Sequence, residues 1–176
     1  MSLKNITPIN REIVLKEDDL IVSKTDLKGK ITYVNQVFTQ ISGFTERDVL
    51  GVQHNVVRHP DMPRAVFKTL WDHIQNGQEI FAFVKNMAKD GSFYWVMANV
   101  TASRDETGTV VGYYSVRRKP NPRVLPAVSA LYQQMLDAER KAGARDAIAA
   151  STQLLTNVLS DMGLSYEQFV LSLQAA

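Results

Sequence analysis

The sequence contains no cysteine. This absence excludes disulfide bonds, thiolate metal ligands and a cysteine nucleophile. No apolar run approaches the roughly 18 residues that a membrane-spanning helix needs, and no apolar segment follows a basic start as in a signal peptide. No internal repeat or low-complexity segment is present, which excludes a solenoid and a disordered tail. We therefore expect a cytoplasmic globular protein without a membrane span.

The charge balance is also unremarkable, with a formal net charge of +2 over 176 residues. Lysine and arginine are scattered along the chain, whereas a nucleic-acid-binding surface needs them clustered on one element. We expect no nucleic-acid partner. Apolar residues make up 45% of the chain, which is ample for the core of one domain with an extension.

Motifs of catalytic chemistry are missing as well. The sequence has no GxxxxGK[ST] phosphate loop, no dinucleotide-binding GxGxxG, no HExxH zinc motif and no GxSxG nucleophile elbow. Carboxylates are plentiful, but no pair stands in a context that suggests acid–base catalysis. We therefore expect a protein that is not an enzyme and that holds no metal site of its own.

Five short segments rich in β-branched and aromatic residues predict strands. The first two are separated by Leu27-Lys28-Gly29, which predicts a β-hairpin, and the later ones by an Asp90-Gly91 turn and a turn over 104–108. The predicted strands cover residues 21–26, 30–35, 79–87, 92–103 and 109–118.

Short helices are predicted between these two groups of strands. Asn35 is a good N-cap for a helix that ends at Gly43, and Thr45-x-x-Asp48 is a second, weaker start signal. In a small α+β domain such a helical band lies across one face of the sheet and closes a pocket.

The run His54 to Pro63 crowds ionisable side chains before a helix, which we expect to begin near Asp61 as N-cap and to continue over 64–76. Arg58 and His59 then precede a helix N-terminus, where backbone N–H groups favour an anion. A phosphate-bearing ligand is one interpretation, and a structural N-cap with a salt-bridged arginine is the simpler alternative.

The ends of the chain differ from this centre. Residues 1–19 are predicted as an irregular cap with a helical turn near Ile13–Leu15, and two prolines mark 119–123 as a linker between a domain over 20–118 and an extension over 124–176. The extension shows amphipathic helices broken at Gly143 and Gly163, and a Ser165-x-x-Gln168 capping box. Its apolar faces pack on each other and the sheet, or form a dimer or output interface.

A family resemblance rests on the segment HNVVRHPDMPRA, with TDLKGKITYVNQVFTQISGFTERDVLG before it and VKNMAKDGSFYWVMANV after it. This stretch resembles the PAS domain of Aer-type aerotaxis transducers, over roughly Leu20 to Arg118. The resemblance implies an α+β PAS fold with a five-stranded antiparallel sheet, short helices on one face and bound FAD. Because the chain has no cysteine, the photochemistry of LOV domains, which forms a cysteinyl–flavin bond, is excluded.

The resemblance also implies the cofactor-binding residues. Four match motif positions that the family needs for FAD, namely Arg58, His59, Asp61 and Asn86. Five others fall on family-like positions and are expected to line the pocket, namely Asn35, His54, Trp71, Trp95 and Asn99. Tryptophan supplies a flat stacking surface, and asparagine can both donate and accept at the polar edge of a flavin.

Within this set Arg58 suits the pyrophosphate, because a guanidinium makes bidentate, charge-assisted hydrogen bonds to phosphate oxygens. Asp61 is expected to cap the helix and to orient Arg58 or His59. Two alternatives remain open: a haem with His54, His59 or His73 as axial ligand, and an unfilled pocket in a module that acts only through dimerisation.

The expected function is redox or oxygen sensing in chemotaxis-type signal transduction. Aer-type transducers continue into a membrane anchor and a signalling coiled coil, whereas this chain stops at Ala176. We therefore expect the output to come from a partner in trans, or from a larger protein of which this chain is a part.

Overall fold

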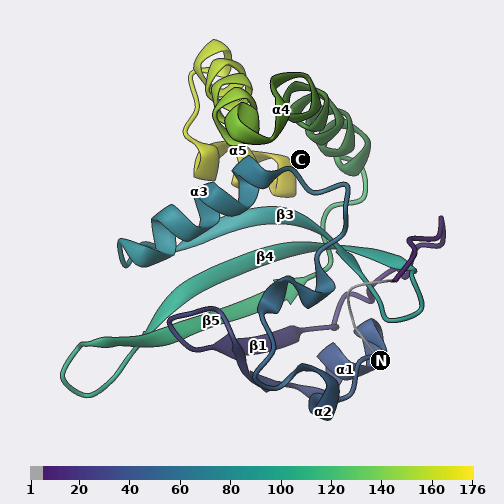
Figure 1. The fold of residues 1–176 in the computed structure, drawn as a ribbon, viewed down its shortest axis with the longest axis vertical. Coiled ribbons are helices and arrows are strands. Elements are labelled where there is room, and N and C mark those ends of the chain that lie inside the picture. The colour runs from purple at the N-terminus through teal and green to yellow at the C-terminus, as the bar shows by residue number, and fades with distance from the viewer. Residues whose placement is uncertain (1–5) are drawn as a thin grey trace.

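The structure, a computed structural model, describes residues 6–176. Five strands form one antiparallel sheet, as the family resemblance implied, in the order β2-β1-β5-β4-β3 (Figure 1). The strands are β1 (Ile21–Thr25), β2 (Ile31–Val34), β3 (Ile80–Met87), β4 (Phe93–Arg104) and β5 (Val110–Arg118). The two later turns bring β4 to the middle of the β3-β4-β5 meander, and β1 joins this meander through β5.

Local capping chemistry forms the helical band as predicted. Helix α1 (Gln36–Ser42) begins where the Asn35 side chain accepts a hydrogen bond from the backbone N–H of Phe38. Helix α2 (Glu46–Val49) has the reciprocal capping box of Thr45 and Asp48. The band continues through the 3₁₀ helix η1 (His54–Val57) into α3 (Arg64–Gln75).

The predicted extent of α3, residues 64–76, is confirmed to within one residue, but its predicted N-cap is wrong. Asp61 is not its N-cap, because the helix begins three residues later and Pro63 occupies the cap position without a side-chain hydrogen bond. The carboxylate that caps this helix comes from far along the chain. Glu139 Oε1 accepts from the backbone N–H of Arg64 at 2.7 Å and from that of Ala65 at 3.4 Å.

The predicted helical turn near Ile13–Leu15 is also wrong. The chain there is extended and runs beside the start of β4, with Ile13 N donating to the Phe93 carbonyl at 2.8 Å and Phe93 N to the Arg11 carbonyl at 2.9 Å. Pairing with a strand satisfies the backbone groups that a helical turn would have bonded internally. The first part of the predicted cap, residues 1–5, lies outside the described residues.

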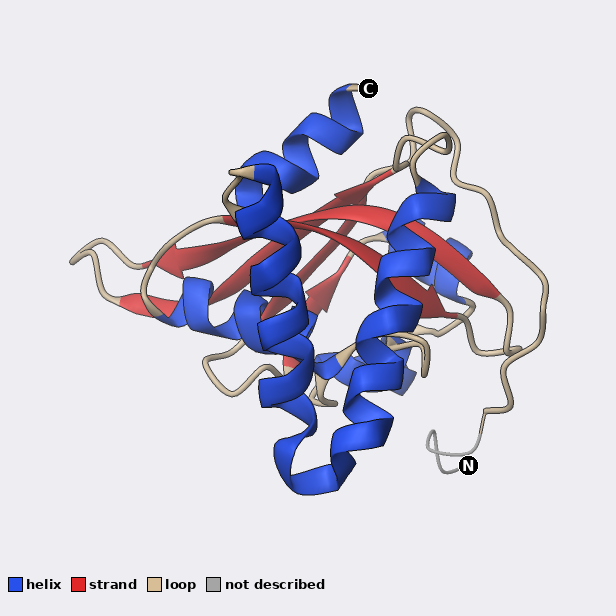
Figure 2. Cartoon of the chain, turned by 90° about the horizontal axis from the view of Figure 1, so that it is seen from above, coloured by secondary structure: helices blue, strands red, loops and turns tan. Residues whose placement is uncertain are grey.

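The first C-terminal helix is bent into two antiparallel halves, which form a hairpin over the sheet (Figure 2). Helix α4 (Leu125–Met162) is interrupted at Gly143, whose φ of 76° and ψ of 173° are not helical, as the predicted break requires. Helix α5 (Tyr166–Ala175) begins at the predicted capping box of Ser165 and Gln168.

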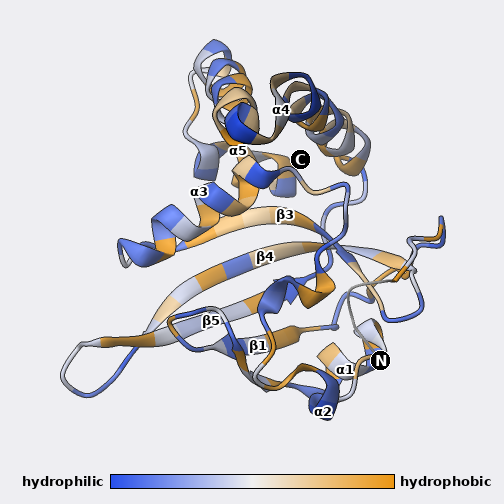
Figure 3. Cartoon of the chain, in the orientation of Figure 1, coloured by the Kyte–Doolittle hydropathy of each residue, from blue (hydrophilic) through white to orange (hydrophobic). Residues whose placement is uncertain are grey.

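These helices bury their apolar sides on the sheet, which was the simpler of the two interpretations. The Tyr132 hydroxyl of α4 donates to the backbone carbonyl of Phe83 on β3 at 2.7 Å, and its ring lies 6.1 Å from that of Trp95. Strand β3 is apolar along most of its length, whereas α4 carries many hydrophilic residues on its outer side (Figure 3). Within residues 6–176, no helix combines the length and the apolar character needed to cross a bilayer.

We predict that Gly143→Ala destabilises the protein by about 1–3 kcal/mol, because its φ and ψ lie in a region that only glycine adopts readily. Gly163→Ala is the matched control and should cost less, because Gly163 ends the same helix in the left-handed region (φ 66°, ψ 27°), which alanine adopts at a cost of about 1–2 kcal/mol. Neither added Cβ meets an atom within 4 Å, so backbone strain alone is compared. Urea unfolding measures both, and equal losses would contradict the prediction.

Candidate ligand-binding site

A cavity of about 170 Å³ lies between one face of the sheet, η1 and α3. Its walls are mainly apolar side chains from α3 and the sheet, namely Phe67, Leu70, Ile74, Val84, Ala98 and Val100. Ligand cavities are usually apolar with a few polar groups, but they are larger, at roughly 300–1,000 Å³. This cavity therefore suits a flat ring system and not a whole dinucleotide.

Four of the nine predicted site residues line this cavity: His54, Arg58, Trp71 and Asn86. They come from η1, from the loop after it, from α3 and from β3, so residues up to 32 positions apart converge on one cavity. Asn86 is buried on the inner face of β3. The structure thus brings together the arginine, one histidine, one tryptophan and one asparagine of the expected set.

Trp71 fits at this place because the first hairpin makes room for it. Its ring packs edge-on against Tyr113, with centroids 5.5 Å apart and an interplanar angle of 88°. Gly29 lies so close that an added Cβ would stand 2.9 Å from the indole, and its φ of 76° also favours glycine. The turn glycine therefore serves both the hairpin and the wall of the cavity.

Trp95 and Asn99 do not line the cavity, contrary to the prediction. Successive side chains of a strand point to opposite faces, and Ala98 of β4 faces the cavity, so both odd-numbered residues face the other way. Trp95 packs against Tyr132 of α4, and the Asn99 amide donates to Glu79 Oε1 at 2.6 Å.

Asn35 is also absent from the cavity wall, because the backbone uses its whole side chain. Its carbonyl oxygen accepts from the N–H groups of Val22 and Phe38, each at 3.0 Å, and its amide donates to the Leu20 carbonyl at 2.8 Å. Asn35 therefore ties α1 to β1, and the prediction that it lines the pocket is contradicted.

His59 and Asp61 lie in the loop beside the cavity and do not line it. Asp61 pairs with Lys85 at 2.6 Å, and its backbone N–H donates to His59 Nδ1 at 3.1 Å. Asp61 thus contacts His59, as expected, although it does not cap α3. Burial first, and then the charge of Lys85, lower the pKa of His59 below its usual value.

This loop covers the exposed edge of the sheet, because β3 is an edge strand. Arg58 forms an antiparallel bridge with Asn86, and the His59 N–H lies 3.4 Å from the Lys85 carbonyl. The Arg58 guanidinium donates to the Met62 carbonyl at 2.9 Å and stands 4.3 Å from the centre of the Phe67 ring. It forms no ion pair with a carboxylate of residues 6–176.

The sequence did not point to the most unusual group in the cavity, Arg117 of β5. This arginine is only 2% exposed, and its Nη2 donates to Ser23 Oγ, which in turn lies 2.9 Å from His54 Nε2. Its Nε has no hydrogen-bond partner among residues 6–176. The alternation of Tyr113, Ser115 and Arg117 toward one face could have indicated an inward arginine, but its place near a strand end suggested a solvated charge.

The polar patch in this apolar cavity consists of Arg117, Ser23 and His54, and it carries a fixed positive charge. Burial lowers the pKa of Arg117 to about 10, so the guanidinium stays positive at neutral pH. Burial first, and then the charge of Arg117, lower the pKa of His54 to about 3. His54 is therefore neutral. Because a guanidinium can only donate, the contact of Arg117 Nη1 with His54 Nε2 at 3.4 Å makes Nε2 an acceptor and leaves the proton on Nδ1. The patch favours a ligand that presents acceptor atoms or negative charge.

The histidines considered as haem ligands are dispersed. His54 alone of the three lines the cavity, and its Nε2 is engaged by Ser23. His59 Nδ1 accepts from the backbone of Asp61, and His73 Nδ1 lies 2.7 Å from the Thr69 carbonyl on α3.

Comparison with protein families gives a match to the PAS fold over residues 31–117. The aerotaxis receptor of Escherichia coli (strain K12) is 40% identical over 121 residues, which cover 69% of this chain and 24% of the receptor. The bacterioopsin transcriptional activator of Halobacterium salinarum is 26% identical over 121 residues, or 17% of its length. The chain thus spans a quarter or less of the length of these relatives.

Solved structures agree on the fold. A light-oxygen-voltage domain studied with a flavin analogue aligns with a TM-score of 0.55 at 23% identity, covering 65% of this chain and 86% of that one. The light state of the Aureochrome1 LOV photoreceptor also gives 0.55, at 19% identity, over 69% of this chain and 92% of that one. At such identities the likeness concerns the fold alone.

We predict that His54→Gln makes the protein less sensitive to acid. The pKa of His54 is about 3 in the folded protein and near its ordinary 6.5 in the unfolded chain, so the unfolded state takes up the proton first. Wild-type stability should therefore fall as the pH drops from 6.5 toward 3, by up to about 1.4 kcal/mol per pH unit from this group. Urea unfolding of both proteins across this range isolates the contribution, and parallel curves would contradict it.

Proposed function

Because this chain belongs to the PAS family of sensory domains, we propose that it binds FAD and signals the redox state of the cell. The 40% identity to the aerotaxis receptor over 69% of the chain supports this proposal. The residues in the cavity supply the physical argument.

The cavity fits the ring system of a flavin in character. It is enclosed by apolar side chains and the flat indole of Trp71, and its polar groups gather at Asn86 and around Arg117. One buried polar atom of a residue that lines the cavity, Arg117 Nε, has no partner within the described residues. A polar ligand edge would satisfy what the protein leaves unpaired.

The unpaired charge of Arg117 carries the proposal. A buried guanidinium without a carboxylate is costly. Among residues 6–176, the Arg117 guanidinium contacts the Ser23 hydroxyl, the His54 imidazole at 3.4 Å and the Phe38 ring at 5.6 Å, and no carboxylate pairs with it. The cost falls if a ligand brings negative charge to the cavity. When bound, a flavin supplies reversible reduction, in which negative charge develops at the pyrimidine end of its ring.

In this proposal each residue of the chain has a defined task. Arg117 stabilises negative charge in the cavity, with Ser23 and His54 fixing the position of its guanidinium. Asn86 offers an amide to the polar edge of the ring, Trp71 a flat wall, and Arg58 a cation at the border of the cavity. His59 and Asp61 act indirectly, by holding the Arg58 loop on the edge of β3.

The sheet would transmit the signal from the cavity to the C-terminal helices. Inward residues of β3 such as Asn86 alternate with outward residues such as Phe83, whose carbonyl accepts from Tyr132 of α4. A change of charge in the cavity would thus act on strands that also carry the C-terminal helices. We propose that the module is not catalytic and that a partner in trans, a second copy or a further domain reads the helices.

An absorption spectrum of the purified protein tests the cofactor. We expect a yellow protein with flavin bands that dithionite bleaches, and release of FAD on denaturation. A Soret band would replace the proposal with a haem sensor. A colourless protein that takes up no added flavin would leave an interaction module, and either result would contradict the proposal.

We predict that Arg117→Gln makes the midpoint potential of the bound flavin more negative by about 30–60 mV. A hydrogen bond to a charged group contributes about 1.5–3 kcal/mol, and about 1.4 kcal/mol corresponds to 30 mV for a two-electron couple. Arg118→Gln is the matched control, because Arg118 is the next residue on β5 but is exposed on the opposite face. Spectroelectrochemical titration measures both potentials, and equal shifts in the two variants would remove Arg117 from this role.

A further inference from the structure

A second hollow lies on the other side of Arg58. It is a cleft of about 500 Å³ between the loop that leads into α3 and the hairpin of α4, and Arg58 lines both it and the first cavity. The ionisable residues that line the cleft are Arg58, Asp61, Arg64, Glu139 and Arg140.

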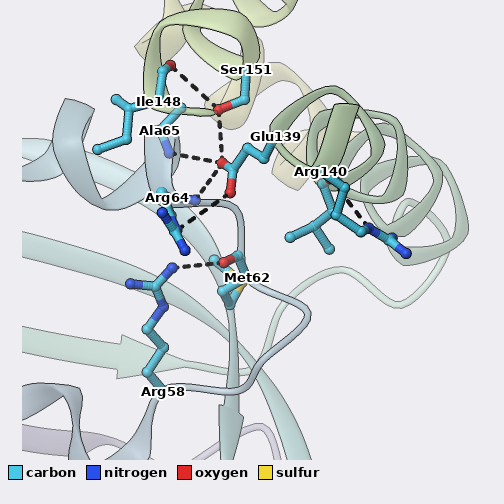
Figure 4. Close-up of polar contacts among 9 residues, drawn as sticks. Arg58, Met62, Arg64, Ala65, Glu139, Arg140, Ile148 and Ser151 are labelled. Carbon is cyan, nitrogen blue, oxygen red and sulfur yellow. Dashed lines mark hydrogen bonds and ion pairs between the residues drawn. The ribbon is translucent and has the colours of Figure 1, made fainter. Parts of the chain in front are cut away.

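Two guanidinium groups face each other in this cleft. Arg58 and Arg64 project toward one another from the two ends of the loop, with Glu139 of α4 behind Arg64 (Figure 4). Arg58 forms no ion pair with a carboxylate of residues 6–176, and Arg64 Nε lies 3.9 Å from Glu139 Oε2, at the limit of an ion pair. The nearby acid Asp61 is already paired with Lys85.

Besides Asp61, Glu139 is the carboxylate that lines this cleft, and other groups hold it. Its side chain is 7% exposed, and its Oε1 accepts from the N–H of Arg64 and from the Ser151 hydroxyl, each at 2.7 Å. Burial lowers the pKa of Arg58, the charge of Glu139 raises it and that of Arg64 lowers it, so these charges act on one another. The charge of the buried Glu139 carboxylate thus acts on both Arg58 and Arg64.

We propose that the Arg58–Arg64 pair holds the diphosphate of a flavin dinucleotide in this cleft, and that Glu139 competes with the diphosphate for the two arginines. This inference rests on the proposed function. The first cavity has room for the ring alone, so the rest of a dinucleotide has to leave it, and Arg58 is the charged residue that both hollows share. Two facing guanidinium groups match two linked phosphates, each of which accepts charge-assisted hydrogen bonds.

The competition links the ligand to the helical hairpin. Glu139 attaches α4 to the start of α3, and a diphosphate beside it places like charges close together in a partly buried cleft. Binding of the dinucleotide therefore weakens the attachment of α4, and release of the hairpin strengthens dinucleotide binding. The bare ring system, which does not reach the cleft, has no such effect.

The experiment compares riboflavin with FAD as ligands of the protein freed of flavin. Affinities from fluorescence titration are measured for the wild type, Arg64→Gln, Glu139→Gln and Arg145→Gln. Riboflavin reports the first cavity alone, and the ratio of the two affinities reports the cleft. Arg145→Gln is the matched control, because Arg145 is an exposed arginine of α4 that lines neither the cavity nor the cleft.

Arg64→Gln should weaken FAD binding about tenfold or more and leave riboflavin unchanged, because it removes a charged partner of phosphate. Glu139→Gln should tighten FAD binding about threefold or more, since glutamine still accepts from the Arg64 N–H but carries no competing charge. Arg145→Gln should alter neither affinity. Thermal unfolding checks that each variant is folded, and Arg64→Lys, which keeps the charge, should lose less FAD affinity than Arg64→Gln.

The outcomes separate the two levels of the proposal. If riboflavin and FAD both fail to bind the wild type, the proposed function and this inference fall together. If both bind but Arg64→Gln leaves their ratio unchanged, the diphosphate site is wrong and the flavin cavity stands. If Glu139→Gln does not tighten FAD binding, the competition with α4 is overturned.

Discussion

The alternation of side chains across β3 and β4 is the constraint on which this structure depends. Because every second residue points to the same face, one pair of strands supplies the wall of the cavity with Asn86 and Ala98 and the seat of α4 with Phe83 and Trp95. Neither face can change its register without changing the other, because a shift of one residue exchanges the two sets. The cavity and the helical extension are therefore built on the same backbone.

The edge position of β3 explains the second feature, the loop from Arg58 to Pro63. An edge strand exposes unpaired N–H and C=O groups, and here the loop bonds to them while it carries Arg58 between the cavity and the cleft. Glu139 closes the far end of this loop by capping α3 from α4. Strand β3, this loop and α4, which are distant in the sequence, thus meet around Arg58 and Glu139. In our proposal, negative charge on a ligand at this place weakens the attachment of the C-terminal helices.

The sequence predicted well wherever a structure follows from neighbouring residues. The first hairpin, the caps at Asn35 and Ser165 and the break at Gly143 all depend on local hydrogen bonds or on a backbone conformation that glycine favours. It predicted poorly where the partner is remote. Asp61 has the chemistry of an N-cap, yet Lys85 takes its carboxylate and a glutamate 75 residues away from Arg64 provides the cap.

The sequence by itself determined the five strands, the helical band and the presence of a polar motif before α3, because hydrophobic period, turn residues and capping groups act over a few residues. Only the tertiary structure decided which side chains share the cavity. It turned Asn99 to the opposite face, used Asn35 to tie α1 to β1, and placed Arg117 in the interior without an ion pair to any carboxylate of residues 6–176. Strand register and long-range packing set these positions, and neither is written in the identity of a single residue.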